Sequence, residues 1–189
     1  MEKNTDLFFT CSLIDYIARK TKNVRADIVN QLGKQRIEKI FNFADSYHCD
    51  DIDRVSDEFI EEAQIKNGNF DNVKECLYDI PSHWDIGKVY KRLINEVAEY
   101  ENISKADALI KVYNSFLSPK IDDYNSTVYC ENPSYLFESY RENRILKKNA
   151  PYKYGAFCVI VRAPKTENAQ KLTVPVGFVS AFSFSVAVQ

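Results

Sequence analysis

The chain has 189 residues, 45% of them hydrophobic and 28% charged, which is typical of a globular protein and excludes a fibrous or low-complexity chain. Five cysteines, an odd number with no close pair, argue against a disulfide framework and against a zinc knuckle. The first residues lack a signal-peptide layout and no stretch is long and apolar enough to cross a bilayer, so we expect a cytoplasmic protein that does not enter the membrane.

The formal net charge of -2 conceals an asymmetry along the chain. Residues 1–132 carry 17 basic and 24 acidic side chains, a net charge of -7, whereas residues 133–189 carry 8 basic and 3 acidic ones, a net charge of +5. A basic end can bind nucleic acid or an acidic protein surface, and it can also dock on the acidic part of its own chain. We favour the last of these outcomes.

A helical pattern opens the chain. Apolar residues recur at intervals of three and four from Asp6 to about Lys20, which predicts a helix with one buried face. Lys20, Lys22 and Arg25 then form a basic turn that leads into a short helix over residues 25–32. Gly33 is expected to end this helix, because glycine adopts the left-handed conformation without a steric penalty.

Two further helices complete a four-helix region over residues 1–66. The third runs to about Tyr47. The fourth carries Ile52 and Phe59 on its buried face, and the acidic pair Asp50-Asp51 stands where it can cap the first turn.

Residues 67–189 form a second region, which we expect to pack with the first as one unit. Ser82 and Asp85 have the spacing of a capping box, and an apolar stripe continues from there to Tyr100. A second box at Ser104 begins another helix, so the two predict an antiparallel helical hairpin. Asn132, followed by proline, is expected to begin a last helix.

The end of the chain has the period of two that is typical of strands. Large residues alternate over Gly155–Arg162 and again over Leu172–Gln189, which predicts a hairpin, and Ser126–Cys130 is a candidate third strand. The fold class is therefore expected to be α+β and mainly α, with an N-terminal helical bundle and a small antiparallel C-terminal sheet. An uncharged last strand requires a cover, which can be the helices of the chain, a protein partner or a second copy. The residues expected to face that cover are Val174, Val176, Phe178, Phe182 and Phe184.

Acidic residues cluster on the fourth helix. Asp57, Glu58, Glu61 and Glu62 have the spacing of one helical face, which can present carboxylates to a metal ion or to a basic partner. No histidine joins them at ligand spacing. We therefore interpret them as a solvated acidic face that a protein partner can contact, and interpret Asp122-Asp123 in the same way. No metal site and no cofactor are predicted.

Basic and aromatic residues interleave over residues 140–154, as they do in proteins that bind RNA or single strands. In the alternative interpretation, the tyrosines pack on the protein and the cations stay in water. The candidate contacts for nucleic acid or for an acidic partner are Arg141, Arg144, Lys147, Lys148 and Lys153. A helix-turn-helix around Gly33, with Lys34, Arg36 and Lys39 toward DNA, is a second reading of the cations.

Enzymatic motifs are not evident. With five glycines the chain has no phosphate-cradling loop and no nucleophile elbow. A site could still be assembled from distant residues, for which the candidates are Tyr47, His48, Cys49 and His83. No catalytic residue is assigned.

The spacing of Tyr16, Ala26-Asp27, Phe41 and Tyr47-His48 resembles that of a family of short bacterial helical proteins. The resemblance covers residues 7–62. Members of this family are encoded beside candidate ADP-ribosyltransferase-like toxins, so the resemblance implies an accessory or antitoxin-like role. We therefore expect a non-enzymatic protein-binding module, with nucleic-acid binding through residues 140–154 and an assembled enzyme site as the alternatives.

Overall fold

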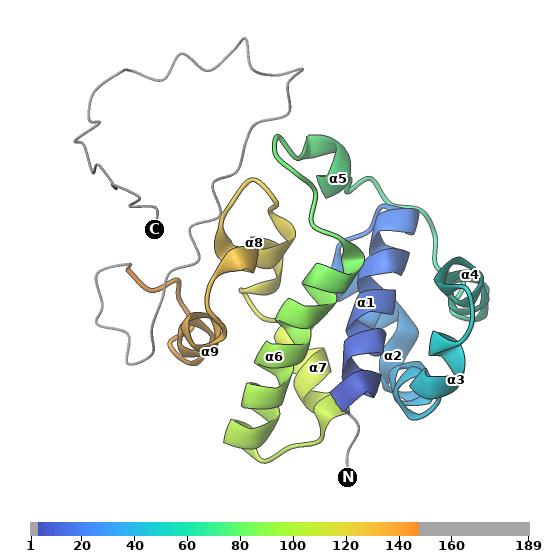
Figure 1. Ribbon diagram of the computed structural model, residues 1–189, viewed down its shortest axis with the longest axis horizontal. Coiled ribbons are helices and arrows are strands. Elements are labelled where there is room, and N and C mark those ends of the chain that lie inside the picture. The colour runs from blue at the N-terminus through green and yellow to red at the C-terminus, as the bar shows by residue number, and fades with distance from the viewer. Residues whose placement is uncertain (1–3, 148–189) are drawn as a thin grey trace, which may run out of the picture.

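The computed structural model describes residues 4–147, which form nine α-helices and one 3-10 helix (Figure 1). In chain order these are α1 (Asn4–Thr21), α2 (Arg25–Asn42), α3 (Ala44–His48), α4 (Ile52–Glu62), α5 (Asn72–Glu75), α6 (His83–Glu101), α7 (Lys105–Tyr113), α8 (Ser118–Asp122), η1 (Val128–Cys130) and α9 (Pro133–Arg141).

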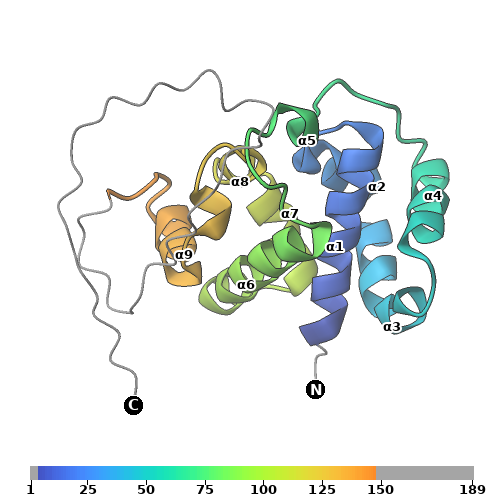
Figure 2. The same ribbon diagram turned by 45° about the horizontal axis from the view of Figure 1, so that its top comes forward.

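Helix α1 lies at the centre of the bundle (Figures 1 and 2). It packs most extensively against α6 and next against α2, while α3 and α4 cover a further part of its surface. Helix α7 packs on both α6 and α2. Helices α8 and α9 lie on the side of α6 that faces away from α3 and α4 (Figure 2).

The expected α+β fold is wrong for the described part of the chain, because residues 4–147 contain helices and no strand. The candidate strand Ser126–Cys130 is instead a turn followed by η1. Asp123 organises this turn: its carbonyl accepts from the backbone N–H of Ser126 at 3.0 Å, and its carboxylate accepts from the N–H of Asn125 at 3.0 Å. Local side-chain bonds of this kind compete with strand pairing.

The predicted C-terminal hairpin, Gly155–Arg162 with Leu172–Gln189, lies outside the described residues. So do the residues expected to meet a cover, namely Val174, Val176, Phe178, Phe182 and Phe184. With no strand in residues 4–147, the expected partner contact through a C-terminal strand has no support. Within residues 4–147, a binding surface has to be sought on the helices and the loops between them.

The predicted helix starts are confirmed where a side chain caps them. The Asp51 carboxylate accepts from the N–H of Asp53, and the Asn132 side chain accepts from the N–H of Ser134. Ser82 and Asp85 form the predicted reciprocal box at the start of α6. Each cap satisfies N–H groups that have no partner within the helix, so these boundaries are set locally.

The predicted break at Gly33 is also confirmed, although the helix resumes directly after it. Gly33 has φ 68° and ψ 165°, which divides α2 into two helical halves. A residue with a Cβ seldom adopts this backbone conformation, so glycine is required at the break.

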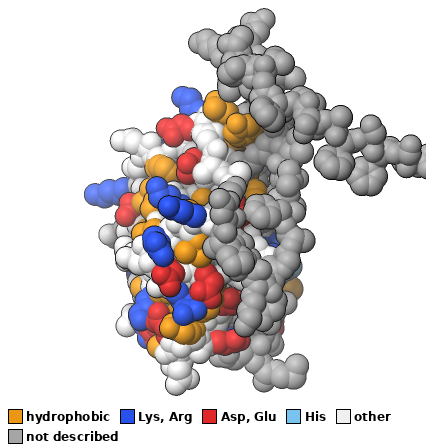
Figure 3. Space-filling view, turned by 90° about the vertical axis from the view of Figure 1, so that its left-hand side faces the viewer, with side chains coloured by type: hydrophobic (Ala, Val, Ile, Leu, Met, Phe, Trp, Pro, Cys, Tyr) orange, Lys and Arg blue, Asp and Glu red, His pale blue; other side chains and the backbone are white. Residues whose placement is uncertain are grey.

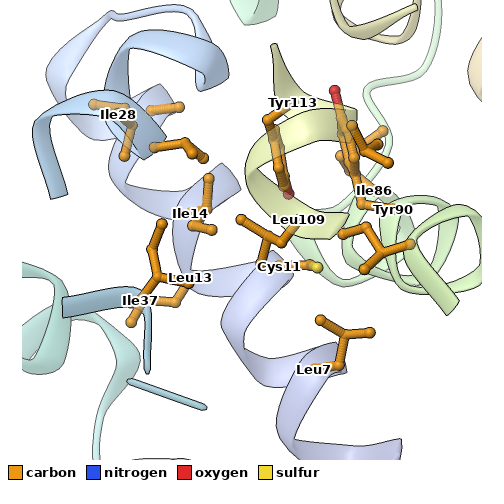
Figure 4. Packing of buried hydrophobic residues seen from close by; sticks show 14 of the residues in the cluster. Leu7, Cys11, Leu13, Ile14, Ile28, Ile37, Ile86, Tyr90, Leu109 and Tyr113 are labelled. Atoms are coloured by element: carbon orange, nitrogen blue, oxygen red, sulfur yellow. The ribbon is translucent and has the colours of Figure 1, made fainter. Parts of the chain in front are cut away.

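The core is built around α1. Figure 4 shows its side chains lying between those of α2 on one side and those of α6 and α7 on the other. Leu7, Cys11, Leu13 and Ile14 are fully buried, and Tyr90 stacks on Tyr113 with ring centroids 4.0 Å apart. The side chains of both predicted regions belong to this one hydrophobic cluster.

A glycine permits α1 and α6 to approach closely. A Cβ on Gly87 would lie 2.1 Å from Ser12 Oγ and 3.0 Å from the Ser12 backbone nitrogen. Since real contacts are not that short, the crossing of these two helices depends on the absence of a side chain at residue 87.

Charged side chains are buried beside this apolar core. Arg25, 1% exposed, donates to the carboxylates of Asp15 and Asp122 and to the hydroxyl of Tyr124. Arg19 joins the same cluster, with its Nε 2.7 Å from Asp15 Oδ2 and its Nη2 donating to Tyr124 at 2.6 Å. Burial lowers the pKa of Arg25, but the charges of Asp15 and Asp122 outweigh burial and hold the pKa well above its usual value.

Asp122 was expected to lie in solvent and is instead 3% exposed. Its segment is fastened to several others. Tyr90 and Ser118 share a hydrogen bond of 2.9 Å, Asn72 donates to the Asp122 carbonyl at 2.9 Å, and Asn125 Oδ1 accepts from the N–H of Leu77 at 2.8 Å. Residues 118–125 therefore connect the α1–α2 pair, the loop before α6, and α6 itself.

Residues 4–147 contain no helix with the length and apolarity needed to cross a bilayer.

Replacing Arg25 by Met should lower the free energy of unfolding by about 3–5 kcal/mol, because buried Asp122 loses its counter-charge and buried Asp15 keeps only that of Arg19. Urea unfolding followed by circular dichroism measures this change. Arg54→Met is the matched control: its ion pair with Asp50 is exposed, and we expect a loss of about 1 kcal/mol or less. Adding Asp15→Asn and Asp122→Asn to Arg25→Met should restore part of the loss. A loss of less than about 1 kcal/mol for Arg25→Met would show that the buried contacts of Arg25 with Asp15 and Asp122 do not hold these segments together.

Gly87→Ala should destabilise the protein by about 1–3 kcal/mol, because the added methyl group overlaps Ser12. The penalty should shrink in a Ser12→Ala background, which removes the nearest atom, so a double-mutant cycle in urea measures the contact. If Gly87→Ala costs as much stability in the Ser12→Ala variant as in the wild type, the added methyl group does not act through the Ser12 side chain.

Candidate functional site

A groove of about 360 Å³ opens at one end of the bundle, where α6 and α9 both end and where the chain leaves α7. It is lined by Tyr100, Glu101, Ser115, Phe116, Tyr140, Arg141 and Asn143. We refer to it as the α6–α9 groove.

Local structure places the groove residues. Asn102, which follows the last residue of α6, adopts φ 54° and caps the helix, so Tyr100 and Glu101 belong to its final turn. Helix α9 ends in the same way shortly before Asn143, which has φ 49°. Left-handed residues of this kind stop a helix and turn the chain away, leaving the last side chains at a free end.

Tyr100 and Arg141 form an exposed wall of the groove. Tyr100 is 61% exposed, although the helical stripe predicts it as a core residue. The guanidinium carbon of Arg141 lies 5.1 Å from the centroid of the Tyr100 ring and 6.0 Å from that of Phe137. Arg141 Nη1 also donates to both carboxylate oxygens of Glu138 at 2.9 Å. The cation is thus held in one place on an exposed aromatic surface.

The interactions of Arg141 favour its charged form. Hydrogen bonding to the Tyr100 side chain, followed by the charge of Glu138, raises the pKa of Arg141 above its usual value. Arg141 therefore presents a permanent positive charge at the groove.

Glu101 supplies the opposite charge. Its Oε1 accepts from the Tyr140 hydroxyl at 3.2 Å, and its Oε2 accepts from Lys111 Nζ at 2.6 Å. Burial, together with the neighbouring charge of Glu101, raises the pKa of Tyr140 to about 12, so the phenol stays protonated and remains a donor. The Glu101 carboxylate in the groove therefore already has two hydrogen-bond donors, Tyr140 and Lys111.

The predicted basic stretch reaches this groove in part. Arg141 lines it, and Arg144 follows, with Nη2 3.5 Å from Glu142 Oε2. Lys147 is exposed at the end of the described range, and Lys148 and Lys153 lie outside it. Arg141 is thus the one cation of the described part of the stretch that lines the groove, and the Leu146 carbonyl accepts from the Tyr135 hydroxyl at 2.9 Å, so the chain after Arg144 runs back toward the start of α9.

The acidic face of α4 and the cations proposed for DNA contact are largely paired with one another. Lys39 Nζ lies 2.8 Å from Glu62 Oε2 and 3.6 Å from Glu58 Oε1, and Arg36 Nε lies 3.2 Å from Glu62 Oε1. Lys34 pairs with Asp107 on α7 at 2.6 Å. Lys34, Arg36 and Lys39, which a helix-turn-helix would direct toward DNA phosphates, are thus ion-paired with carboxylates of this chain.

Figure 3 shows a similar mixture on a face at 90° to the first view, where Lys and Arg side chains alternate with Asp and Glu side chains over the visible part.

The residues proposed for an assembled enzyme site come together only in part. The ring centroids of His48 and His83 lie 6.3 Å and 4.6 Å from that of Trp84. The ring of Tyr47 packs instead on Phe59, and the Cys49 thiol donates to the Asp45 carbonyl at 3.3 Å. The histidines therefore form an aromatic contact with Trp84 at the start of α6.

His83 is half-buried in this contact, and its Nε2 is buried without a hydrogen-bond partner. Burial lowers the pKa of His83 below 6.5, and the charge of Arg19 acts in the same direction, while Asp15 and Asp85 oppose them. Neutral His83 is therefore the form that the fold favours.

Among the described residues, no three His, Cys, Asp or Glu side chains lie close enough together to hold a metal ion. The sequence predicted Arg141 as a contact but missed Tyr100, Glu101 and Phe116, all of which belong to helical segments interpreted as a packed hairpin. Comparison with protein-family models, curated proteins and solved structures finds no match to this chain.

Stability should fall as the pH drops through the range in which His83 becomes protonated. The unfolded chain takes up the proton near pH 6.5 and the folded chain only at lower pH, so the stabilisation is complete above 6.5 and is lost as the pH falls through the folded-state pKa. Urea unfolding at several pH values, followed by the fluorescence of the single Trp84, measures it. His83→Gln should remove this part of the pH dependence and His48→Gln should retain it. Equal pH slopes in wild type and His83→Gln would contradict the assignment.

Proposed function

We propose that this protein is a non-enzymatic binding module that holds a protein partner at the α6–α9 groove. The observation that carries the proposal is the exposed pair of Tyr100 and Arg141, in which the guanidinium rests on the ring beside an open groove. Tyrosine and arginine are over-represented among the residues that dominate protein–protein binding energy.

The groove side chains are held in position before any partner arrives. Arg141 is held by Glu138 and by two rings, and the Tyr140 hydroxyl is held by Glu101. Fixing a long side chain on association costs about 0.5–1.5 kcal/mol, so groups that are already ordered bind with a smaller loss of entropy.

The groove is the size of an anchoring pocket. A specific interface buries about 800 Å² and uses about 20–30 residues on each partner, which is more than the seven residues that line the groove can supply. We therefore place one or two side chains of the partner in the groove and the rest of the contact on the helices around it.

The resemblance of residues 7–62 to accessory proteins encoded beside ADP-ribosyltransferase-like toxins supports a protein-binding role, and the groove itself is built from residues 100–143. The resemblance names the first partner to try, which is the product of the adjacent gene. An accessory or antitoxin-like protein acts by covering a surface, and such a role requires anchoring side chains rather than catalytic ones.

Co-expression with the adjacent gene product should yield a complex of fixed stoichiometry, measured by size exclusion with light scattering. Tyr100→Ala and Arg141→Ala should each raise the Kd by about tenfold or more, because anchoring residues contribute more than about 1 kcal/mol. Arg54→Ala is the control: this arginine is also exposed and ion-paired but belongs to α4. Complexes that form equally well with the groove variants would move the site elsewhere, and the absence of a complex would reject this partner.

A further inference from the structure

We infer that the part of the partner that enters the α6–α9 groove is an uncharged peptide segment. It places one aromatic or large apolar side chain against the rings of the groove and pairs its backbone with the side-chain amide of Asn143. The inference rests on the proposed function and adds the chemistry of the occupant.

The charged side chains of the groove are balanced within the chain, which argues against a charged occupant. Among the lining residues only Glu101 and Arg141 carry a charge. Lys111 Nζ lies 2.6 Å from Glu101 Oε2, and Glu138 Oε2 lies 2.9 Å from Arg141 Nη1. A carboxylate or phosphate of a partner would meet the two glutamates, and a cation would meet Arg141 and Lys111. Like charges brought together oppose binding, so the groove favours a segment without charge.

Three aromatic rings supply an apolar surface for such a segment. Tyr100 lines the groove from α6, Phe116 from the segment between α7 and α8, and Tyr140 from α9. Tyr100 is largely exposed, and the other two rings are half-buried, so part of each ring remains open to solvent. Covering this surface with an apolar group is favourable, and contact between aromatic rings adds to the gain. The rings therefore select an aromatic or large apolar side chain.

One polar side chain in the groove has no hydrogen-bond partner among residues 4–147, and it is uncharged. This is the amide of Asn143, an exposed residue. The Ser115 hydroxyl, in contrast, donates to the Val112 carbonyl at 2.7 Å. A carboxamide has both N–H donors and a carbonyl acceptor, which match the C=O and the N–H of a peptide group. Asn143 can therefore hold the backbone of the segment whose side chain contacts the rings.

Titration of the isotope-labelled full chain, followed by nuclear magnetic resonance, tests the inference because it detects weak binding at individual residues. The probes are terminally blocked peptides of Ser, Thr and Gln with a central Phe or a central Ala, two peptides that keep the Phe but carry Asp or Lys in place of Ser, and a single-stranded oligothymidine. We expect the uncharged Phe peptide to bind most tightly. Its Kd should rise about fivefold or more on Phe→Ala, because the ring contacts are lost.

Two groove variants and a matched control locate the binding. Tyr100→Ala should raise the Kd of the uncharged Phe peptide about fivefold or more. Asn143→Gly should raise it about threefold or more, because glycine retains the φ of 49° at this position and removes the amide. Phe43→Ala should leave it unchanged, since Phe43 is 56% exposed but lies between α2 and α3. Raising NaCl from about 50 to about 500 mM should change the Kd less than about twofold, because no ion pair forms on binding.

Tighter binding of the Asp peptide, the Lys peptide or oligothymidine would overturn the inference, as would no binding of the uncharged Phe peptide or an unchanged Kd for Asn143→Gly. A dimer that light scattering detects and Tyr100→Ala disrupts would also overturn it, because the groove would then hold a second copy of the chain.

Failure of the inference can be separated from failure of the proposed function. If the complex with the adjacent gene product forms and depends on Tyr100, the proposed function stands and only the occupant is wrong. A complex that Tyr100→Ala leaves intact rejects the groove itself. Unchanged circular dichroism of each variant shows that a loss of binding is not a loss of fold.

Discussion

The buried guanidinium of Arg25 is the interaction on which the arrangement of the chain depends. It joins Asp15 of α1 to Asp122 at the end of α8, two residues that are far apart in the sequence. Tyr124 extends the same cluster to Arg19. A buried ion pair gives little net stability, but removing one member leaves a buried charge, so the pair strongly disfavours other placements of these segments.

The position of the groove follows from that constraint. With Asp122 and Tyr124 fixed, the chain enters the turn at Asp123 and η1 from a defined point, and Asn132 then begins α9 alongside α6. The close crossing of α1 and α6 at Gly87 fixes the position of α6, against which α9 packs. The exposed ends of α6 and α9 thus meet because residues far from the groove hold their helices in place.

Charged side chains of α4 and of the groove are ion-paired within the fold. The acidic face of α4 is largely paired with Lys20, Arg36 and Lys39, so two conspicuous charge patterns in the sequence stabilise the fold together. At the groove, Arg141 is likewise paired with Glu138, and its guanidinium also rests on the exposed ring of Tyr100, which is a combination that association with a partner can use.

Sequence reasoning succeeded where one short segment determines the result. The caps at Asp51, Ser82 and Asn132 and the break at Gly33 depend on neighbouring residues, and all were predicted. It failed where a distant partner decides. Asp122 was interpreted as a solvated acid because Arg25, 97 residues away, could not be assigned to it.

The groove was hidden from the sequence for a similar reason. A helical stripe shows which residues share a face, but not where the covering helix ends, so Tyr100 was counted as core. Strand propensity misled at Val128–Cys130, where a turn closed by Asp123 prevailed.

Oxidative footprinting of the free and partner-bound protein tests the central claim most directly, because it reports the exposure of individual side chains. Tyr100 and Phe43 are 61% and 56% exposed and lie in different parts of the bundle, so each serves as the reference for the other. We expect partner binding to protect Tyr100 strongly and to leave Phe43 unchanged. Protection of Phe43 with Tyr100 still freely modified would contradict the assignment of the groove.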